Sequence, residues 1–80
     1  MIKFTIQHVQ DFKTSKKPFS TITAYDYVSA QIIDEAQIPL ILVGDSASMM
    51  VYGYDTTIPI SVDEMLLVTK AVARGAKHSL

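Results

Sequence analysis

Asp45 and Ser46 are two adjacent residues whose side chains and position in the sequence could do chemistry. They follow Gly44 and four branched apolar residues, Leu40 to Val43. A continuous apolar run of this length is typical of a strand buried on both faces of a parallel sheet. Ligands of such sheets bind just beyond the carboxyl ends of the strands. A carboxylate and a hydroxyl there indicate a ligand site, although Gly-Asp-Ser also suits a turn and serine can cap a helix.

The residues before this strand predict another strand and a helix, all within about 25 residues, the size of a compact βαβ unit. The first strand lies in the β-branched run from Phe19 to Tyr25, which follows Pro18. Asp26 is expected to cap a helix over 27–37, and Pro39 ends that helix. The helix carries an apolar stripe that could pack on the sheet, consisting of Val28, Ile32, Ile33 and Ala36.

The segment from Asp45 to Pro59 is expected to be a loop, longer than the usual range of about 2–6 residues for such connections. A second helix should then begin at Ser61, because Ser61 and Glu64 have the spacing of a capping box. It should end near Arg74, with Gly75 in the left-handed position after the last turn. Its predicted packing face consists of Val62, Met65, Leu66, Thr69, Val72 and Ala73.

The first residues carry less information. Val9 to Phe12 could form a short helix, and the polar run from Thr14 to Lys17 would follow it. His8 could be a metal ligand, but a lone histidine is more often a surface residue, and we interpret it as one.

The composition limits the class of protein. The chain has 80 residues, 49% of them hydrophobic and 19% charged, which favours a globular core over disorder. The net charge of −1, with scattered Lys and Arg, argues against nucleic-acid binding. The absence of cysteine excludes disulfides and thiolate metal sites, and no apolar run is long enough to span a membrane. We therefore expect a cytoplasmic protein.

The predicted order of elements is strand, helix, strand, loop, helix, so a third strand is expected next. Two parallel strands with two helices make a poor independent fold. We interpret residues 1–80 as the N-terminal part of a single, longer α/β domain. A non-catalytic fragment that folds only on a partner is an alternative.

Four segments resemble, in order and spacing, the ketopantoate hydroxymethyltransferase (3-methyl-2-oxobutanoate hydroxymethyltransferase) family. They are Thr23-Ala24-Tyr25-Asp26, Leu42-Val43-Gly44-Asp45-Ser46, Gly53-Tyr54-Asp55-Thr56-Thr57-Ile58-Pro59 and Thr69-Lys70-Ala71-Val72-Ala73-Arg74-Gly75-Ala76. The resemblance implies a (β/α)8 TIM barrel, of which this chain would supply the N-terminal segment and the first two βα units.

The resemblance also implies an activity. The family transfers a hydroxymethyl group from 5,10-methylenetetrahydrofolate to 3-methyl-2-oxobutanoate, giving 2-dehydropantoate in pantothenate biosynthesis. Asp45 would be a Mg²⁺ ligand, and Asp45 with Ser46 would bind the 2-oxo acid, whose enolate the metal stabilises. The resemblance puts the general base after Leu80, so no catalytic base lies in this chain and the chain alone should be inactive. It further implies a homo-oligomer, a decamer in the family.

Two features depart from the family's usual pattern. Ala47-Ser48 stands where a bulky apolar residue and glycine are common, and Gln37 stands near a common glycine. A residue other than glycine in a left-handed helix cap costs roughly 1 kcal/mol. A Mg²⁺-dependent barrel lyase of the phosphoenolpyruvate mutase or isocitrate lyase type is the other enzyme considered, and the segment from Gly53 to Pro59 favours the transferase.

Overall fold

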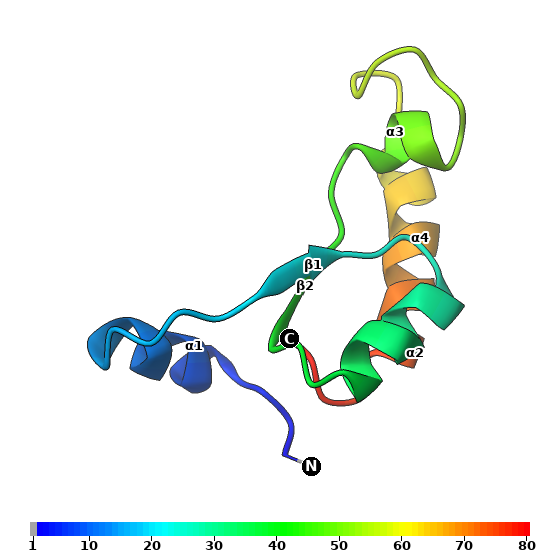
Figure 1. The fold of residues 1–80 in the computed structure, drawn as a ribbon. Coiled ribbons are helices and arrows are strands. Elements are labelled where there is room, and N and C mark those ends of the chain that lie inside the picture. Colours follow the sequence, from blue (N-terminus) through cyan, green and yellow to red (C-terminus); the bar gives the residue numbers. More distant parts are fainter. Residues whose placement is uncertain (1) are drawn as a thin grey trace.

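The computed structural model describes residues 2–80 and has α/β content with a small parallel sheet (Figure 1). The predicted strand–helix–strand unit and the later helix are confirmed, whereas α3 lies in the segment that was predicted to be a loop. The elements are α1 (Ile6–Thr14), β1 (Thr21–Thr23), α2 (Tyr27–Glu35), β2 (Leu40–Leu42), α3 (Ala47–Met50) and α4 (Val62–Gly75).

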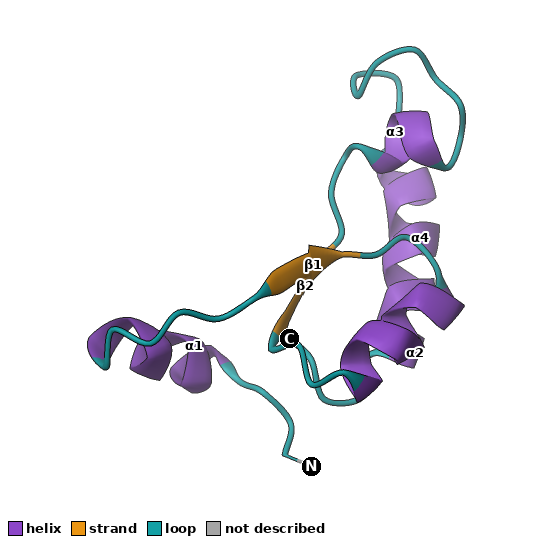
Figure 2. Cartoon of the chain, viewed as in Figure 1, coloured by secondary structure: helices purple, strands orange, loops and turns teal. Residues whose placement is uncertain are grey.

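The two strands pair in parallel, with Thr21 opposite Leu40 and Thr23 opposite Leu42. The Ala24 amide extends the pairing by donating to the Leu42 carbonyl at 3.2 Å. Figure 2 shows α2 and α4 together on one side of the strands, while α1 stands apart near their amino ends. The carboxyl ends of β1 and β2 therefore meet at one edge of the sheet, where the chain continues into α2 and α3.

The prediction that the central strand is buried on both faces is wrong for residues 2–80. Ile41 and Val43 pack against the core, but Leu42 is 55% exposed. The reason is that α2 and α4 cover only one face of the two strands (Figure 1). The core itself is small and consists of Ala24, Ala30 and Val72.

Leu80 lies along the second edge of β2. The Leu80 amide donates to the Pro39 carbonyl at 2.8 Å, and the Ile41 amide donates to the Leu80 carbonyl at 2.8 Å. In parallel strands, one residue hydrogen-bonds through its amide and its carbonyl to the two residues that flank its opposite number. Leu80 does this with the residues on either side of Leu40. The segment after α4 thus runs beside β2 in the same direction.

Asp34 joins α2 to this final segment. Its carboxylate is buried, and Oδ1 accepts hydrogen bonds from the amides of His78 and Ser79 at 2.7 Å each. His78 Nδ1 lies 2.8 Å from Oδ2. Burial alone would raise the pKa of Asp34, but the hydrogen bonds from Ser79 and His78 outweigh it and hold the pKa well below its usual range.

The N-cap of α2 is as predicted, but its packing face is not. Asp26 Oδ2 accepts from the Ser29 amide at 3.0 Å. The predicted apolar stripe is only partly right: Val28 and Ile32 face outward, with Ile32 63% exposed, whereas Ile33 packs against the core. The buried residues Ala30 and Asp34 were not predicted. Ala30, the smallest side chain of α2, lies against the backbone of α4 at Gly75. The two helices are so close there that a larger side chain would not fit between them.

Helix α4 begins with the predicted capping box of Ser61 and Glu64. The predicted left-handed position of Gly75 is wrong, since Gly75 is the last helical residue. A Cβ atom on Gly75 would lie 2.7 Å from the Tyr27 carbonyl oxygen and 2.9 Å from Ala30 Cβ, so glycine here permits the contact with α2.

The predicted face of α4 is only partly right. Val72 is buried, whereas Val62 and Leu66 are exposed and the buried Val68 was not predicted. The helix is turned so that residues 68, 72 and 75 face inward, because Gly75 is the point of contact with α2.

Two local features complete the fold. Helix α1 is longer than predicted and begins at a capping box in which His8 Nδ1 accepts from the Thr5 amide at 2.9 Å. Gln37 has a φ of 62°, which confirms the left-handed cap expected there. No helix within residues 2–80 is both long enough and apolar enough to cross a membrane.

Candidate functional site

Three side chains with functional groups lie where β1 and β2 end. Tyr25 follows β1, and Asp45 and Ser46 follow β2. The strand register sets Thr23 opposite Leu42, so the chain leaves both strands at the same edge. This is the edge at which parallel α/β sheets bind their ligands.

Asp45 is exposed, and its carboxylate accepts no hydrogen bond from residues 2–80. The turn that contains it is closed by backbone groups instead. The Ala47 amide donates to the Gly44 carbonyl at 3.2 Å, and the Ser48 amide donates to the Asp45 carbonyl at 2.9 Å. The turn therefore does not use the carboxylate, which stays available to a ligand.

Ser46 occupies the N-cap position of α3, but its side chain makes no capping hydrogen bond. Its hydroxyl instead forms a hydrogen bond with the hydroxyl of Tyr25, 21 residues earlier in the chain. This contact ties the end of β1 to the end of β2. The cap interpretation of Ser46 accordingly fails for its side chain.

Asp45 can supply one oxygen ligand to a metal ion. Mg²⁺ is usually held by one or two carboxylates together with substrate oxygens and water, so a single exposed carboxylate at a ligand-binding edge fits part of such a site. In the part of the chain that the structure describes, no group of three or more His, Cys, Asp or Glu side chains converges. The remaining ligands of such an ion would have to come from outside these residues.

Two other acidic residues, Asp26 and Glu64, have structural roles. Asp26 uses both carboxylate oxygens on Ser29, and these hydrogen bonds lower the pKa of Asp26. Glu64 closes the capping box with the Ser61 amide and accepts from Tyr54, and the hydrogen bond from the Ser61 amide lowers its pKa. Neither carboxylate is free to act as an acid or base.

The segment after Ser46 is held in a defined shape. Ser48 is fully buried, and its hydroxyl donates to the Thr56 carbonyl at 2.7 Å. The Tyr54 amide donates to the Ser48 carbonyl at 2.9 Å, and the Tyr54 hydroxyl reaches Glu64 on α4 at 3.1 Å. The departure from the family's pattern at Ser48 therefore adds a hydrogen bond that closes the loop.

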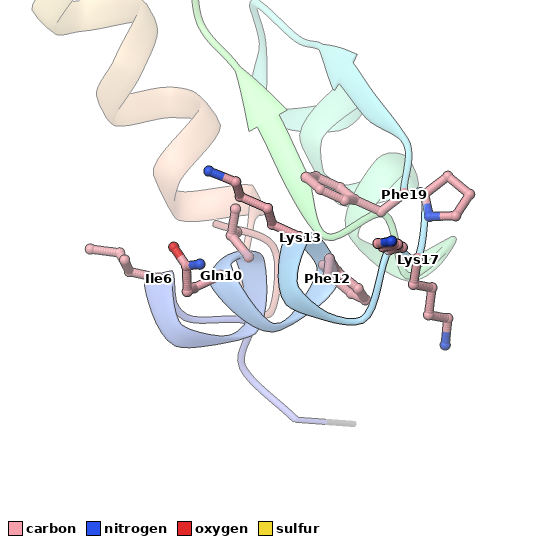
Figure 3. Close-up of a pocket in the computed structure, with 9 residues that line it drawn as sticks. Ile6, Gln10, Phe12, Lys13, Lys17 and Phe19 are labelled. Atoms are coloured by element: carbon pink, nitrogen blue, oxygen red, sulfur yellow. The ribbon is translucent and has the colours of Figure 1, made fainter.

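A hollow of about 600 Å³ lies elsewhere, between α1 and the residues before β1 (Figure 3). Its walls include Phe12 stacked on Phe19 with ring centroids 4.9 Å apart, and Lys13 and Lys17 at the rim. It lies at the amino end of β1, opposite the edge that carries Asp45. We do not assign it to the same site.

The structure brings the predicted pair Asp45 and Ser46 together with Tyr25, whose contact with Ser46 the sequence did not predict. Tyr25 ends the run predicted as the first strand, but nothing in the local sequence gives its partner across the sheet. The fold and this site define a parallel α/β protein with two functional groups at the carboxyl ends of adjacent strands. One is a carboxylate that accepts no hydrogen bond within residues 2–80, and the other is a hydroxyl.

The family model described as ketopantoate hydroxymethyltransferase matches residues 3–80. The chain therefore belongs to the ketopantoate hydroxymethyltransferase family, and the resemblance seen in the sequence is confirmed.

Several curated relatives are named 3-methyl-2-oxobutanoate hydroxymethyltransferase. The protein of Mycobacterium tuberculosis (strain H37Rv) is 51% identical over 78 residues, covering 98% of this chain and 28% of the relative. That of Frankia alni is 49% identical over 78 residues, covering 98% of this chain and 26% of the relative. That of Mycobacterium leprae is 50% identical, with 98% and 27% covered. The chain thus spans about a quarter of the length of these relatives.

Proposed function

We propose that this chain forms the first two βα units of a (β/α)8 barrel that transfers a hydroxymethyl group from 5,10-methylenetetrahydrofolate to 3-methyl-2-oxobutanoate. The product would be 2-dehydropantoate, in pantothenate biosynthesis. The names of the relatives support the acceptor and the transferred group. The observation that carries the proposal is the exposed Asp45 carboxylate beside Ser46, which the turn does not use.

The edge of β2 that does not pair with β1 supports the proposal of a barrel. Leu80 has begun a parallel pairing with β2, as the next strand of a barrel would. A hollow of about 270 Å³ between β2 and α4 is lined mainly by apolar side chains, Ile41, Val43 and Val72 among them. Further strands along this edge would fill it and cover the exposed Leu42.

Asp45 would hold Mg²⁺ with ligands from the substrate, water and the rest of the barrel. When bound, Mg²⁺ would act as a Lewis acid on the 2-oxo acid and ease removal of its C3 proton. The Ser46 hydroxyl would donate to the substrate carboxylate and fix the orientation of C3. Asp45 and Ser46 are adjacent, so the metal and the carboxylate would be held from the same turn.

The covalent chemistry takes place on the substrates. The C3–H bond of the oxo acid breaks, and C3 forms a bond to the methylene carbon of the folate. The two C–N bonds that hold the methylene carbon to the folate break, and water supplies the oxygen and one hydrogen of the new hydroxyl group. The C3 proton and the second proton of water end on the two folate nitrogens, so tetrahydrofolate is the leaving product. The base that takes the C3 proton would come from the remainder of the barrel, as the family resemblance implies.

We also propose a cytoplasmic homo-oligomer. The support is a set of exposed apolar side chains on and after α3, which are Met49, Met50, Val51 and Tyr52. Exposed apolar groups gathered in one segment are typical of an interface between subunits.

The test uses the complete enzyme, meaning the full-length protein in which this chain forms the first quarter of the barrel. Asp45→Asn removes the charged ligand with little change in shape. We expect weaker Mg²⁺ binding by calorimetry and a fall of roughly 100-fold or more in product formation, because the metal would lose a direct ligand. Asp26→Asn is the matched control, since asparagine caps helices as well as aspartate does. Undiminished turnover and Mg²⁺ affinity in Asp45→Asn would contradict the proposal.

A further inference from the structure

The hydroxyls of Tyr25 and Ser46 share a hydrogen bond, and which of them donates its proton determines what else Ser46 can bind. A serine hydroxyl has a single proton to donate and can also accept. If Ser46 donates to the carboxylate of a 2-oxo acid, its proton must point towards the substrate. Its oxygen is then left as the acceptor in the hydrogen bond with Tyr25.

The backbone of Ser46 is fixed, but its hydroxyl is free to rotate. The Ser46 carbonyl accepts from the amides of Met49 and Met50 at 3.1 and 3.0 Å, which holds the residue at the start of α3. The side chain makes no capping hydrogen bond that would select one rotamer. A hydroxyl of this kind has three staggered positions, of which only some aim its proton at a given ligand atom.

Tyr25 is well placed to select that position. Its backbone is held on one side by the Ala24 amide, which donates to the Leu42 carbonyl, and on the other by Asp26, which caps α2. The tyrosine is partly buried, and the backbone on both sides of it is held by hydrogen bonds. Its hydroxyl therefore reaches Ser46 from a rigid support.

We infer that Tyr25 is a positioning residue for the substrate: its hydroxyl donates to Ser46 Oγ and so directs the Ser46 proton to the carboxylate of the bound 2-oxo acid. This inference rests on the proposed function for the identity of the acid. Two hydrogen bonds in series also polarise one another, so the Ser46 hydroxyl becomes a better donor when Tyr25 is in place.

The first test measures binding of 3-methyl-2-oxobutanoate, with Mg²⁺ present, by calorimetry on the complete enzyme. Tyr25→Phe removes the hydroxyl and leaves the ring. We expect the Kd to rise by roughly 3–10-fold, the effect of one neutral hydrogen bond. Tyr27→Phe is the matched control, because within residues 2–80 the Tyr27 hydroxyl bonds to Gln31 alone, on the exposed side of α2. Its Kd should equal that of the wild type.

A double-mutant cycle distinguishes positioning from general damage. Tyr25 acts through Ser46, so Tyr25→Phe should have almost no effect on the Kd in a Ser46→Ala background. In turnover assays Tyr25→Phe should raise KM and leave kcat nearly unchanged, since the carboxylate contact is the same in the ground and transition states.

An unchanged Kd in Tyr25→Phe overturns the inference, as does an equal effect with and without the Ser46 hydroxyl. A fall in kcat at constant KM does the same. The double-mutant cycle measures binding of the 2-oxo acid, so its result does not depend on whether the enzyme transfers the hydroxymethyl group. Loss of the transferase activity would appear in the wild type as binding without folate-dependent turnover. Failure of the wild type to bind the acid at all would overturn the inference as well.

Discussion

Replacing Asp34 with alanine should release the final segment of the chain from α2. The amides of His78 and Ser79 would lose their shared acceptor in a buried setting. A buried donor left without a partner costs about 1–3 kcal/mol, so the two together should cost about 2–6 kcal/mol of local stability. Hydrogen exchange at these two amides in the complete enzyme should therefore become at least about 30-fold faster.

Asp34→Asn is the matched comparison. Both amides bond to Oδ1, which asparagine keeps, so this variant should lose only the strengthening that the negative charge provides. Hydrogen bonds to a charged acceptor are roughly twice as strong as neutral ones, so we expect half of the alanine effect or less. Equal protection in the wild type and in Asp34→Ala would refute this reasoning.

The lowered pKa of the Asp34 carboxylate predicts how the stability of the final segment changes with pH. The stabilisation is fully present above the usual pKa of 3.8 and is lost as the pH falls further towards the pKa in the folded protein. Protection of the two amides, corrected for intrinsic exchange, should decline as the pH falls below about 4. Asp34→Asn should lack this decline. A wild type with the same protection at pH 3 and pH 7 would contradict the assignment.

Two further substitutions test the packing and the loop. Gly75→Ala should lower the Tm, because the new Cβ would lie 2.7 Å from the Tyr27 carbonyl oxygen; overpacking costs about 1–3 kcal/mol, more than alanine gains in helix propensity. Gly44→Ala, whose Cβ meets no atom nearer than 4.0 Å, is the control, and an equal Tm for both variants would rule out the clash. Ser48→Ala should remove the hydrogen bond to the Thr56 carbonyl and cost about 1 kcal/mol, seen as faster exchange in residues 52–56; unaltered exchange there would mean that the loop is held by other contacts.

The features that the sequence predicts well are local. Asp26 and the pair Ser61 and Glu64 cap their helices because a cap depends on residues three positions apart. The left-handed Gln37, by contrast, follows from the family's common glycine near this position and not from the local pattern, which predicts a helix through residue 37 where α2 ends at Glu35. Asp45 and Ser46 could be located because a strand boundary is also a local signal.

The features that could not be predicted depend on contacts between distant segments. Periodicity predicts a packing stripe on α2 of which only Ile33 reaches the core. The helix packs mainly through Ala30, because Gly75, 45 positions later, allows the backbones to approach. Asp34 reads as a surface acid until His78 and Ser79 surround it. The partner of Tyr25 is hidden for the same reason, and α3 is too short to give a periodic signal.

The Asp34 contact also has a consequence for synthesis on the ribosome. Asp34 leaves the ribosome 44 residues before His78, a delay of about 2–9 s at roughly 5–20 residues per second. During that interval the carboxylate has neither of its amide partners, and α2 cannot bury it without cost. The nascent chain should thus keep this end of α2 hydrated until the segment that lies along β2 has emerged, which delays docking until the correct neighbour is present.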